Sequence, residues 1–447
     1  MSALEGARDR FLALHEGFAA SRQGEPAWLA RLRADALGAF REQGLPHTRL
    51  EEWRHTNVTP LAKVPFALAS SPGRAVARDD LEHHAFPVFA CSVFVFVNGR
   101  FAPELSAAQR LNCGTTVESL AEVLRGDPER LASRLGRIAE WKRHPFAALA
   151  TAFVDDGACV RVPRGAGAEQ PIHLVFVSGP RADGQPLLSH PRVLVEAAPG
   201  SRLTLIQDHV AVGTSPGFSN CVTEVEVCPD AQVDLVLVQR EPDYRFHVSN
   251  LAVTQERDSR FAAHTLCFGG AIVRNDAGVR LLGEGAECRL DGLFVAGGRQ
   301  LVDNHTSVDH AVPRCTSRET YKGIVGGRAR GVFRGRILVR PDAQKTSARQ
   351  SNANLLLGAG AEVDTKPQLE ILADDVKCSH GSSVGQLDPD AFFYLCSRGL
   401  SEEVARDLLT RGFAQEILRA LPQPALSDAL DDILQQRLRL AHAGGLS

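Results

Sequence analysis

From about residue 157 the sequence changes to short runs of β-forming residues, and no helical pattern interrupts them for some 200 residues. One run, Thr223–Val227, alternates with a period of two, as a half-buried strand does. A βαβ architecture needs a helix between successive strands, so this pattern excludes it. The clearest runs are Val160–Val162, His173–Val177, Val193–Val195, Leu203–Ile206, Thr223–Val227, Val233–Val238 and Cys288–Val295.

Turn-forming residues recur through the same region about 27 to 30 residues apart, and each precedes a β-type run. Regular turn spacing in an all-β segment favours a solenoid, in which each coil buries its face against the next. A large β-sandwich with chance turn spacing explains the pattern equally well. The turns are Gly200–Ser201, Asp230–Ala231, Asp258–Ser259, Gly285–Ala286 and Pro313–Arg314.

Helical patterns precede the β region. Residues 1–44 predict two helices, the second with Pro26 in its first turn and Gly44 at its end. Residues 117–139 and 144–153 are also helical in pattern, whereas Val93–Val97 predicts a strand. We therefore expect a mostly helical N-terminal domain over residues 1–155, followed by a β core over residues 156–386.

Helical patterns return after residue 386 and predict a C-terminal helical domain over residues 387–447. Asp388 is a good N-cap for a helix that begins with Pro389. Ser401 and Ser427 are expected to cap the two helices that follow. From this pattern alone, a simple cap on the β region is favoured over a docking platform.

Composition narrows the function classes. The 50 basic and 53 acidic residues give a formal net charge of −3, which argues against a general binder of nucleic acid or anionic membranes. No apolar stretch reaches the ~18 residues of a membrane span, and the N-terminus lacks a signal-peptide pattern. Ten cysteines without a C-x-x-C motif favour reduced thiols in a cytoplasmic protein.

Most catalytic motifs are absent from the sequence. Neither a P-loop, a complete dinucleotide fingerprint nor an H-E-x-x-H motif occurs. The segment Gly381–Gly385 does fit G-x-S-x-G with Ser383 as the nucleophile. A hydrolase of that type needs an acid and then a histidine later in the chain, and the only later histidine is His442. A glycine-flanked turn is therefore the favoured interpretation.

Cys378 and His380 carry the most informative chemistry. Residues two apart on a strand point to the same face, so the thiol and the imidazole would project together. These donors suit iron, zinc or copper, but a closed site takes about four ligands, so another coil or chain would have to supply the rest. On spacing alone, a buried cysteine beside a hydrogen-bonded histidine is favoured over a metal site.

The segment Asp364–Leu400 resembles the C-terminal signature of the SufB/SufD family, the scaffold proteins of the SUF iron–sulfur cluster assembly machinery. Val376–Gly381, which reads V-K-C-S-H-G, is similar to the SufD branch, whereas SufB proteins typically carry a Glu-His-Glu-Ala type sequence there. Two upstream segments, Glu51–Asn57 followed by Pro60 and Leu61, and His144–Leu149, are also SufD-like. The resemblance thus covers nearly the whole chain.

The resemblance implies a mainly β fold, with a right-handed parallel β-helix core between helical domains. It implies a complex of SufB, SufD and two copies of the ATPase SufC, in which a SufD-like chain is a non-catalytic subunit. SufC would dock on the helices around residues 389–421, with Phe392, Phe393, Tyr394 and Arg398 as candidate contacts. SufB would pair edge to edge with the late strands of the β-helix.

The resemblance also assigns candidate site residues. His380 matches the SufD histidine of the cluster-building site at the SufB interface, and Cys378 matches its neighbouring cysteine. The sulfur-accepting cysteine belongs to SufB, so the other eight cysteines are expected to be structural. Cys396 replaces a residue that is often arginine. An iron–sulfur cluster would be held transiently in the complex, for which a reduced flavin is a further candidate cofactor, and no cofactor is expected on the isolated chain.

Two other function classes remain open at this point. One is a stand-alone metal-dependent or serine hydrolase that uses Cys378, His380 or Ser383. The other is a passive β-helical structural protein. Co-purification with SufB and SufC would separate the scaffold interpretation from both.

Overall fold

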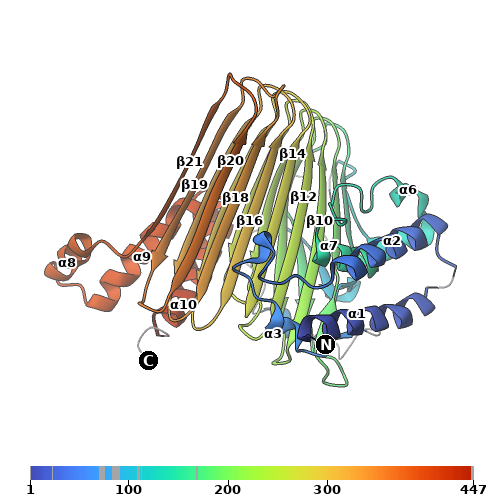
Figure 1. The fold of residues 1–447 in the computed structure, drawn as a ribbon, viewed down its shortest axis with the longest axis horizontal. Coiled ribbons are helices and arrows are strands. Elements are labelled where there is room, and N and C mark those ends of the chain that lie inside the picture. Colours follow the sequence, from blue (N-terminus) through green and yellow to red (C-terminus); the bar gives the residue numbers. More distant parts are fainter. Residues whose placement is uncertain are drawn as a thin grey trace.

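The computed structural model describes residues 2–22, 24–69, 76–82, 91–107, 111, 113–167 and 170–443. Its body is a parallel β-solenoid with helices at its N-terminal and C-terminal ends (Figure 1). From β8 (Arg192–Ala197) onward, consecutive strands alternate between two sheets, and each strand pairs in parallel with the strand two positions later, as β10 (Gly217–Val227) does with β12 (Phe246–Gln255). This pairing identifies a solenoid and rules out the sandwich alternative.

The first sheet has 11 strands and the second has 10. Only β4–β5 and β2–β3 pair antiparallel among the described strands. The first sheet contains β20 (Glu362–Ile371), β18 (Arg330–Val339), β16 (Leu301–His310), β14 (Ile272–Leu281), β12 (Phe246–Gln255), β10 (Gly217–Val227), β8 (Arg192–Ala197), β5 (Gly157–Val162) and β4 (Thr116–Ser119), with β7 (Leu187–Ser189) and β1 (Ala67–Leu68) beside this path. The second contains β21 (Lys377–Gly385), β19 (Ser347–Leu356), β17 (Thr316–Val325), β15 (Glu287–Ala296), β13 (Arg260–Cys267), β11 (Gln232–Gln239), β9 (Arg202–Ala211), β6 (Ile172–Ser178), β2 (Ser92–Val97) and β3 (Arg100–Phe101).

The predicted turns form one corner of the solenoid. Each contributes a residue in the left-handed region, with φ between 55° and 75°, which favours glycine and aspartate. Backbone hydrogen bonds stack these corners, for example from Asp230 N to Arg257 O at 3.0 Å. The small residue after each corner is fully buried. The five left-handed residues are Gly200, Asp230, Asp258, Gly285 and Arg314.

Apolar side chains from both sheets fill the interior, including Val225, Leu235, Phe261 and Phe333. Residues paired along one sheet, such as Thr223, Leu251, Ala277 and Thr306, are 26 to 29 positions apart in the sequence. The spacing of the turns is therefore the length of one coil. Each coil buries its side chains against the next, so the sequence periodicity directly reflects the packing.

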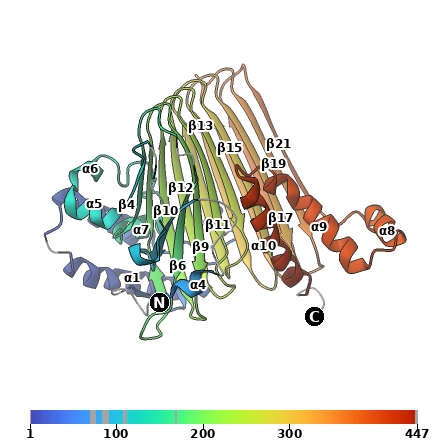
Figure 2. The same ribbon diagram turned by 180° about the vertical axis from the view of Figure 1, so that it is seen from behind.

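Except for α4 (Arg78–Glu82), the N-terminal helices cover the outside of the 11-stranded sheet at its early strands (Figure 1). The α4 segment packs instead beside β2 and β6 of the 10-stranded sheet (Figure 2). The predicted helix over residues 117–139 was too long. Strand β4 occupies its first residues, and Gly126 and Pro128 divide the remainder into two short helices. Pro26 is the N-cap of α2, one position before the helix, while Gly44 ends it as expected. These helices are α1 (Ala3–Ala20), α2 (Ala27–Gln43), α3 (Thr59–Ala62), α4 (Arg78–Glu82), α5 (Leu120–Gly126), α6 (Glu129–Ala132) and α7 (Pro145–Ala152), with short 3₁₀ turns η1 (Glu51–Trp53) and η2 (Pro103–Leu105).

The C-terminal helices are α8 (Pro389–Ser397), α9 (Glu402–Leu418) and α10 (Pro424–Ala443). Figure 2 shows α9 and α10 lying across the outer face of the 10-stranded sheet, while α8 projects beyond it. Asp388 and Ser401 cap α8 and α9 as predicted. The last helix begins at Pro424, so Ser427 lies inside it and is not its cap. Proline is well tolerated in a first helical turn.

Candidate functional site

The solenoid ends at two strands, β20 and β21, that have no further strand beside them among the described residues. Each strand therefore presents one free row of backbone N–H and C=O groups. Lys377 N donates to Thr346 O of the preceding coil at 2.9 Å, so the N–H group of Lys377 points toward β19. Successive N–H groups along a strand point in opposite directions, so every second N–H group, starting with the residue after Lys377, points to the free side of β21. Those groups belong to Cys378, His380, Ser382 and Val384. The end of the solenoid is an open edge for strand addition.

Cys378 and His380 lie on one face of β21, as the sequence predicted. Their partners in β19 are Ala348 and Gln350, which are buried and 2% and 1% exposed. Residues in register share a face, so Cys378 and His380 continue the inward-facing column at the mouth of the interior. Cys378 is half-buried against Ile337 and its neighbours, and burial raises the pKa of its thiol. His380 is exposed because no further coil covers it.

A buried polar group lies directly behind this mouth. Gln350 Nε2 donates to Glu319 Oε2 at 3.1 Å, and Thr306 Oγ1 donates to the same oxygen at 2.5 Å. Glu319 Oε1 and Gln350 Oε1 are buried without a hydrogen-bond partner. Burial raises the pKa of Glu319 to about 7. The interior is therefore polar at the level just below His380, which the sequence patterns did not indicate.

The N-terminal motif Glu51–Asn57 packs against the outside of the late coils. Trp53 is buried beneath the guanidinium of Arg274, whose Cζ lies 4.2 Å from the ring centroid. Thr56 donates to Asp303, and Glu51 accepts from Lys366 of the terminal strand at 2.5 Å. These contacts attach a segment that is distant in the sequence to the late coils of the solenoid.

The four candidate contacts in the α8 region differ in exposure. Phe393 and Tyr394 are 73% and 56% exposed, and Arg398 lies over the Tyr394 ring. Phe392 is half-buried, with the Arg406 guanidinium 5.3 Å from its ring centroid. Exposed aromatic residues of this kind are typical anchors of protein interfaces. Cys396 is half-buried in the same helix.

The hydrolase interpretation lacks its structural context. Ser383 lies within β21, so it is not at the turn between a strand and a helix that a nucleophile elbow requires. The side chain of His442 lies outside the described residues. Within the part of the chain that the structure describes, no three His, Cys, Asp or Glu side chains converge as metal ligands. The same residues contain no helix long and apolar enough to cross a bilayer.

The other eight cysteines are spread along the chain, and none of the ten forms a disulfide. Most are buried, and burial raises the pKa of the Cys221 and Cys267 thiols to about 12. A thiol with such a pKa is a poor nucleophile at neutral pH. Cys113 is exposed and lies in a turn near the N-terminal end of the solenoid.

Comparison with known proteins agrees with this geometry. The family described as SUF system FeS cluster assembly, SufBD core domain, matches residues 180–413, and the SufBD protein N-terminal region matches residues 8–174. An iron–sulfur cluster assembly SufBD family protein of Synechocystis is 35% identical over 89% of this chain and 88% of its own length. The iron–sulfur cluster assembly protein SufD of Escherichia coli is 30% identical over 88% of this chain and 90% of its own. SufD of Bacillus subtilis is 25% identical over 93% and 95%. The chain, a parallel β-solenoid with an open terminal edge, belongs to the SufBD family of iron–sulfur cluster assembly proteins.

Proposed function

We propose that this chain is the SufD-type subunit of a SufBCD scaffold and contributes Cys378 and His380 to a shared site with SufB. The observation that carries the proposal is the open strand β21, which presents both donors beside a free backbone edge. The subunit would be non-catalytic, and ATP hydrolysis would come from SufC. The iron–sulfur cluster is the cargo of the assembly.

The terminal edge supports strand pairing with another chain. Long edge strands usually carry devices that block such pairing, including proline and charged side chains. β20 has Pro367 and Lys366, whereas β21 has no proline and, after its first residue Lys377, no Asp, Glu, Lys or Arg. We infer that SufB completes the sheet at β21.

The edge proposal can be tested with a proline on the free side of β21. Ser382→Pro removes an N–H group that points away from β19, so the internal ladder keeps its hydrogen bonds. We expect the variant to keep its circular dichroism spectrum but to lose co-purification with SufB. Ser382→Thr, which keeps the N–H group, is the matched control. Normal SufB capture by the Ser382→Pro variant would refute pairing at this edge.

The shared site would receive two ligands from this chain and the remainder from its partner. Cys378 supplies a thiol and His380 an imidazole, and a stable four-ligand site needs about two more donors. The exposed position of His380 leaves it free to meet a second chain. Gly381 supports this approach, because nothing lies within 4 Å of where its side chain would begin.

SufC docking on the α8 region follows from exposed apolar groups outside the solenoid. Phe393 and Tyr394 project from α8, and Val404 and Leu408 of α9 are each 46% exposed. Phe393→Ala together with Tyr394→Ala should abolish SufC capture and leave SufB capture unchanged. The control is Arg419→Ala, at the end of α9. Phe413→Ala would not serve, because Phe413 packs against the solenoid and its loss would also affect the fold. Retained SufC capture by the double variant would contradict the proposal.

A further inference from the structure

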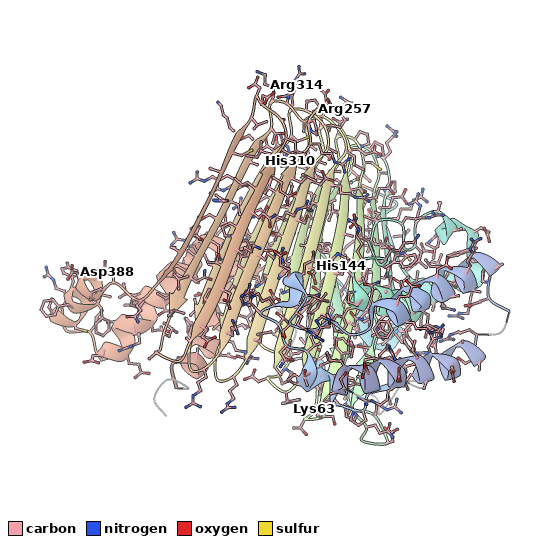
Figure 3. The ribbon with its side chains drawn as sticks, in the orientation of Figure 1. Lys63, His144, Arg257, His310, Arg314 and Asp388 are labelled. Carbon is pink, nitrogen blue, oxygen red and sulfur yellow. The ribbon has the colours of Figure 1, made fainter. Side chains whose placement is uncertain are left out.

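A hollow of about 420 Å³ lies on the outer face of the 11-stranded sheet, away from the terminal edge. It is bounded by the sheet from β12 to β18 and by the segment from Ile138 to His144. In Figure 3, His144 lies beside the middle of the sheet, well below the rim where Arg257 and Arg314 lie. Ligand pockets in proteins have volumes of roughly 300–1,000 Å³, so this hollow can hold a small molecule.

Small side chains form the floor of the hollow. Ala252, Gly278 and Ser307 are neighbours in register on adjacent strands, and Arg336 continues the same row. A Cβ atom on Gly278 would meet only the Leu251 carbonyl oxygen, at 3.9 Å. Larger residues border this row on the same face, including His305 and Arg334 on one side and Arg280 on the other. The sheet is therefore recessed at the place where the basic side chains gather.

Six arginines, four carboxylates and two histidines, His144 and His305, line the hollow. Three of the arginines are already paired: Arg274 with Asp276 and Asp303, Arg340 with Asp309, and Arg336 with Glu370. Arg280 has no hydrogen bond or ion pair with any described residue. The arginines are Arg143, Arg274, Arg280, Arg334, Arg336 and Arg340, and the carboxylates are Glu52, Glu140, Asp276 and Asp309.

Two further cations are only weakly neutralised. Arg143 is 3.9 Å from Glu140, and both side chains are largely exposed, so this pair is easily exchanged for another anion. Arg334 donates one nitrogen to Glu51 at 3.2 Å, while its Nη1 is buried without a partner. A buried guanidinium nitrogen without an acceptor is unfavourable, and an anion in the hollow would supply one.

We propose that this hollow binds a phosphorylated small molecule, with Arg280, Arg334 and Arg143 as its phosphate ligands. Guanidinium groups match phosphate oxygens in forked pairs, and a phosphate group offers enough oxygens for several arginines at once. The small floor residues give the organic part of the molecule room against the sheet. The site is separate from Cys378 and His380 and does not depend on the scaffold role of the chain.

Calorimetric titration of the full-length chain with inorganic pyrophosphate tests the proposal. We expect one binding site per chain, with an affinity about tenfold lower in Arg280→Gln, because a charge-assisted contact is lost. Gly278→Leu should abolish binding by filling the floor, without changing thermal stability. Ser307→Leu fills the same floor from the next strand and replaces Gly278→Leu if that variant does not fold.

Arg314→Gln is the matched control, because it removes the same charge from an exposed corner where Arg314 lies 3.7 Å from Glu284. It should bind pyrophosphate like the unmodified chain. Three results would overturn the proposal: no pyrophosphate binding at millimolar concentration, binding that survives both floor variants and Arg280→Gln, or equal loss in Arg314→Gln. Equal displacement by citrate would also overturn it, since the site would then take any polyanion.

Discussion

Glu319 is the carboxylate whose environment makes the sharpest prediction. It is 1% exposed inside the solenoid, and its Oε1 atom has no hydrogen-bond donor. Burial raises its pKa from the ordinary 4.5 to about 7. The folded chain therefore holds a proton on Glu319 at pH values where the unfolded chain has lost it. This proton also adds a hydrogen-bond donor to the buried group formed by Glu319, Gln350 and Thr306.

The consequence for stability follows from the difference in bound protons. Between pH 4.5 and about 7 the folded state binds more protons than the unfolded state, so stability falls as the pH rises and then levels off. A pKa difference of this size corresponds to about 3 kcal/mol of unfolding free energy. Glu319→Gln keeps the shape and an N–H donor but cannot ionise, so it should remove this loss.

The assay is urea denaturation of the unmodified chain and Glu319→Gln at pH 5 and pH 8, followed by circular dichroism. From pH 5 to pH 8, the unfolding free energy of the unmodified chain should fall by about 3 kcal/mol more than that of Glu319→Gln. Buried histidines such as His209, whose pKa burial lowers to about 3, contribute equally to both proteins and cancel. Glu362→Gln, at an exposed carboxylate, is the control. An unchanged difference between pH 5 and pH 8 would refute the reasoning.

Three further predictions concern the site and the cap. His380→Ala should change the unfolding free energy by less than about 0.5 kcal/mol, because the imidazole is exposed. The same variant should abolish iron incorporation by the SufBCD complex, and a normal iron content would exclude His380 from the site. The isolated chain, mixed with iron and sulfide, should show no stoichiometric cluster absorbance, and one cluster per chain would contradict the two-donor site. Leu434→Ala should lower the unfolding free energy by about 2–5 kcal/mol in urea denaturation, because Leu434 packs fully buried against the sheet, whereas Leu408→Ala should have little effect.

The packing of Leu434 also limits how SufC docking can be examined. Removal of residues 387–447 would expose the apolar outer face of the 10-stranded sheet, including Leu266, Phe268 and Leu293. Loss of SufC binding after such a truncation would then reflect a damaged fold as well as a lost contact. Substitutions confined to α8 avoid this problem, because no residue of that helix is buried.

Much of the fold was predictable because a solenoid repeats a local rule. Each coil needs a left-handed corner and a small buried residue after it, and both requirements act on adjacent positions such as Asp230 and Ala231. The spacing of these pairs therefore predicted the coil length. Helix boundaries were less predictable where proline and glycine compete with periodicity, as at Gly126 and Pro128.

The candidate site also has features that the sequence predicted and features that only the tertiary structure decided. Alternation along one strand was sufficient to put Cys378 and His380 on the same face. Tertiary structure alone decided that this face opens at the end of the interior, that Glu319 lies buried behind it, and that Glu51 reaches Lys366 of the last coil. The physical reason is range: backbone geometry over two residues is local, whereas burial and ion pairing depend on which distant segments the completed coils bring together.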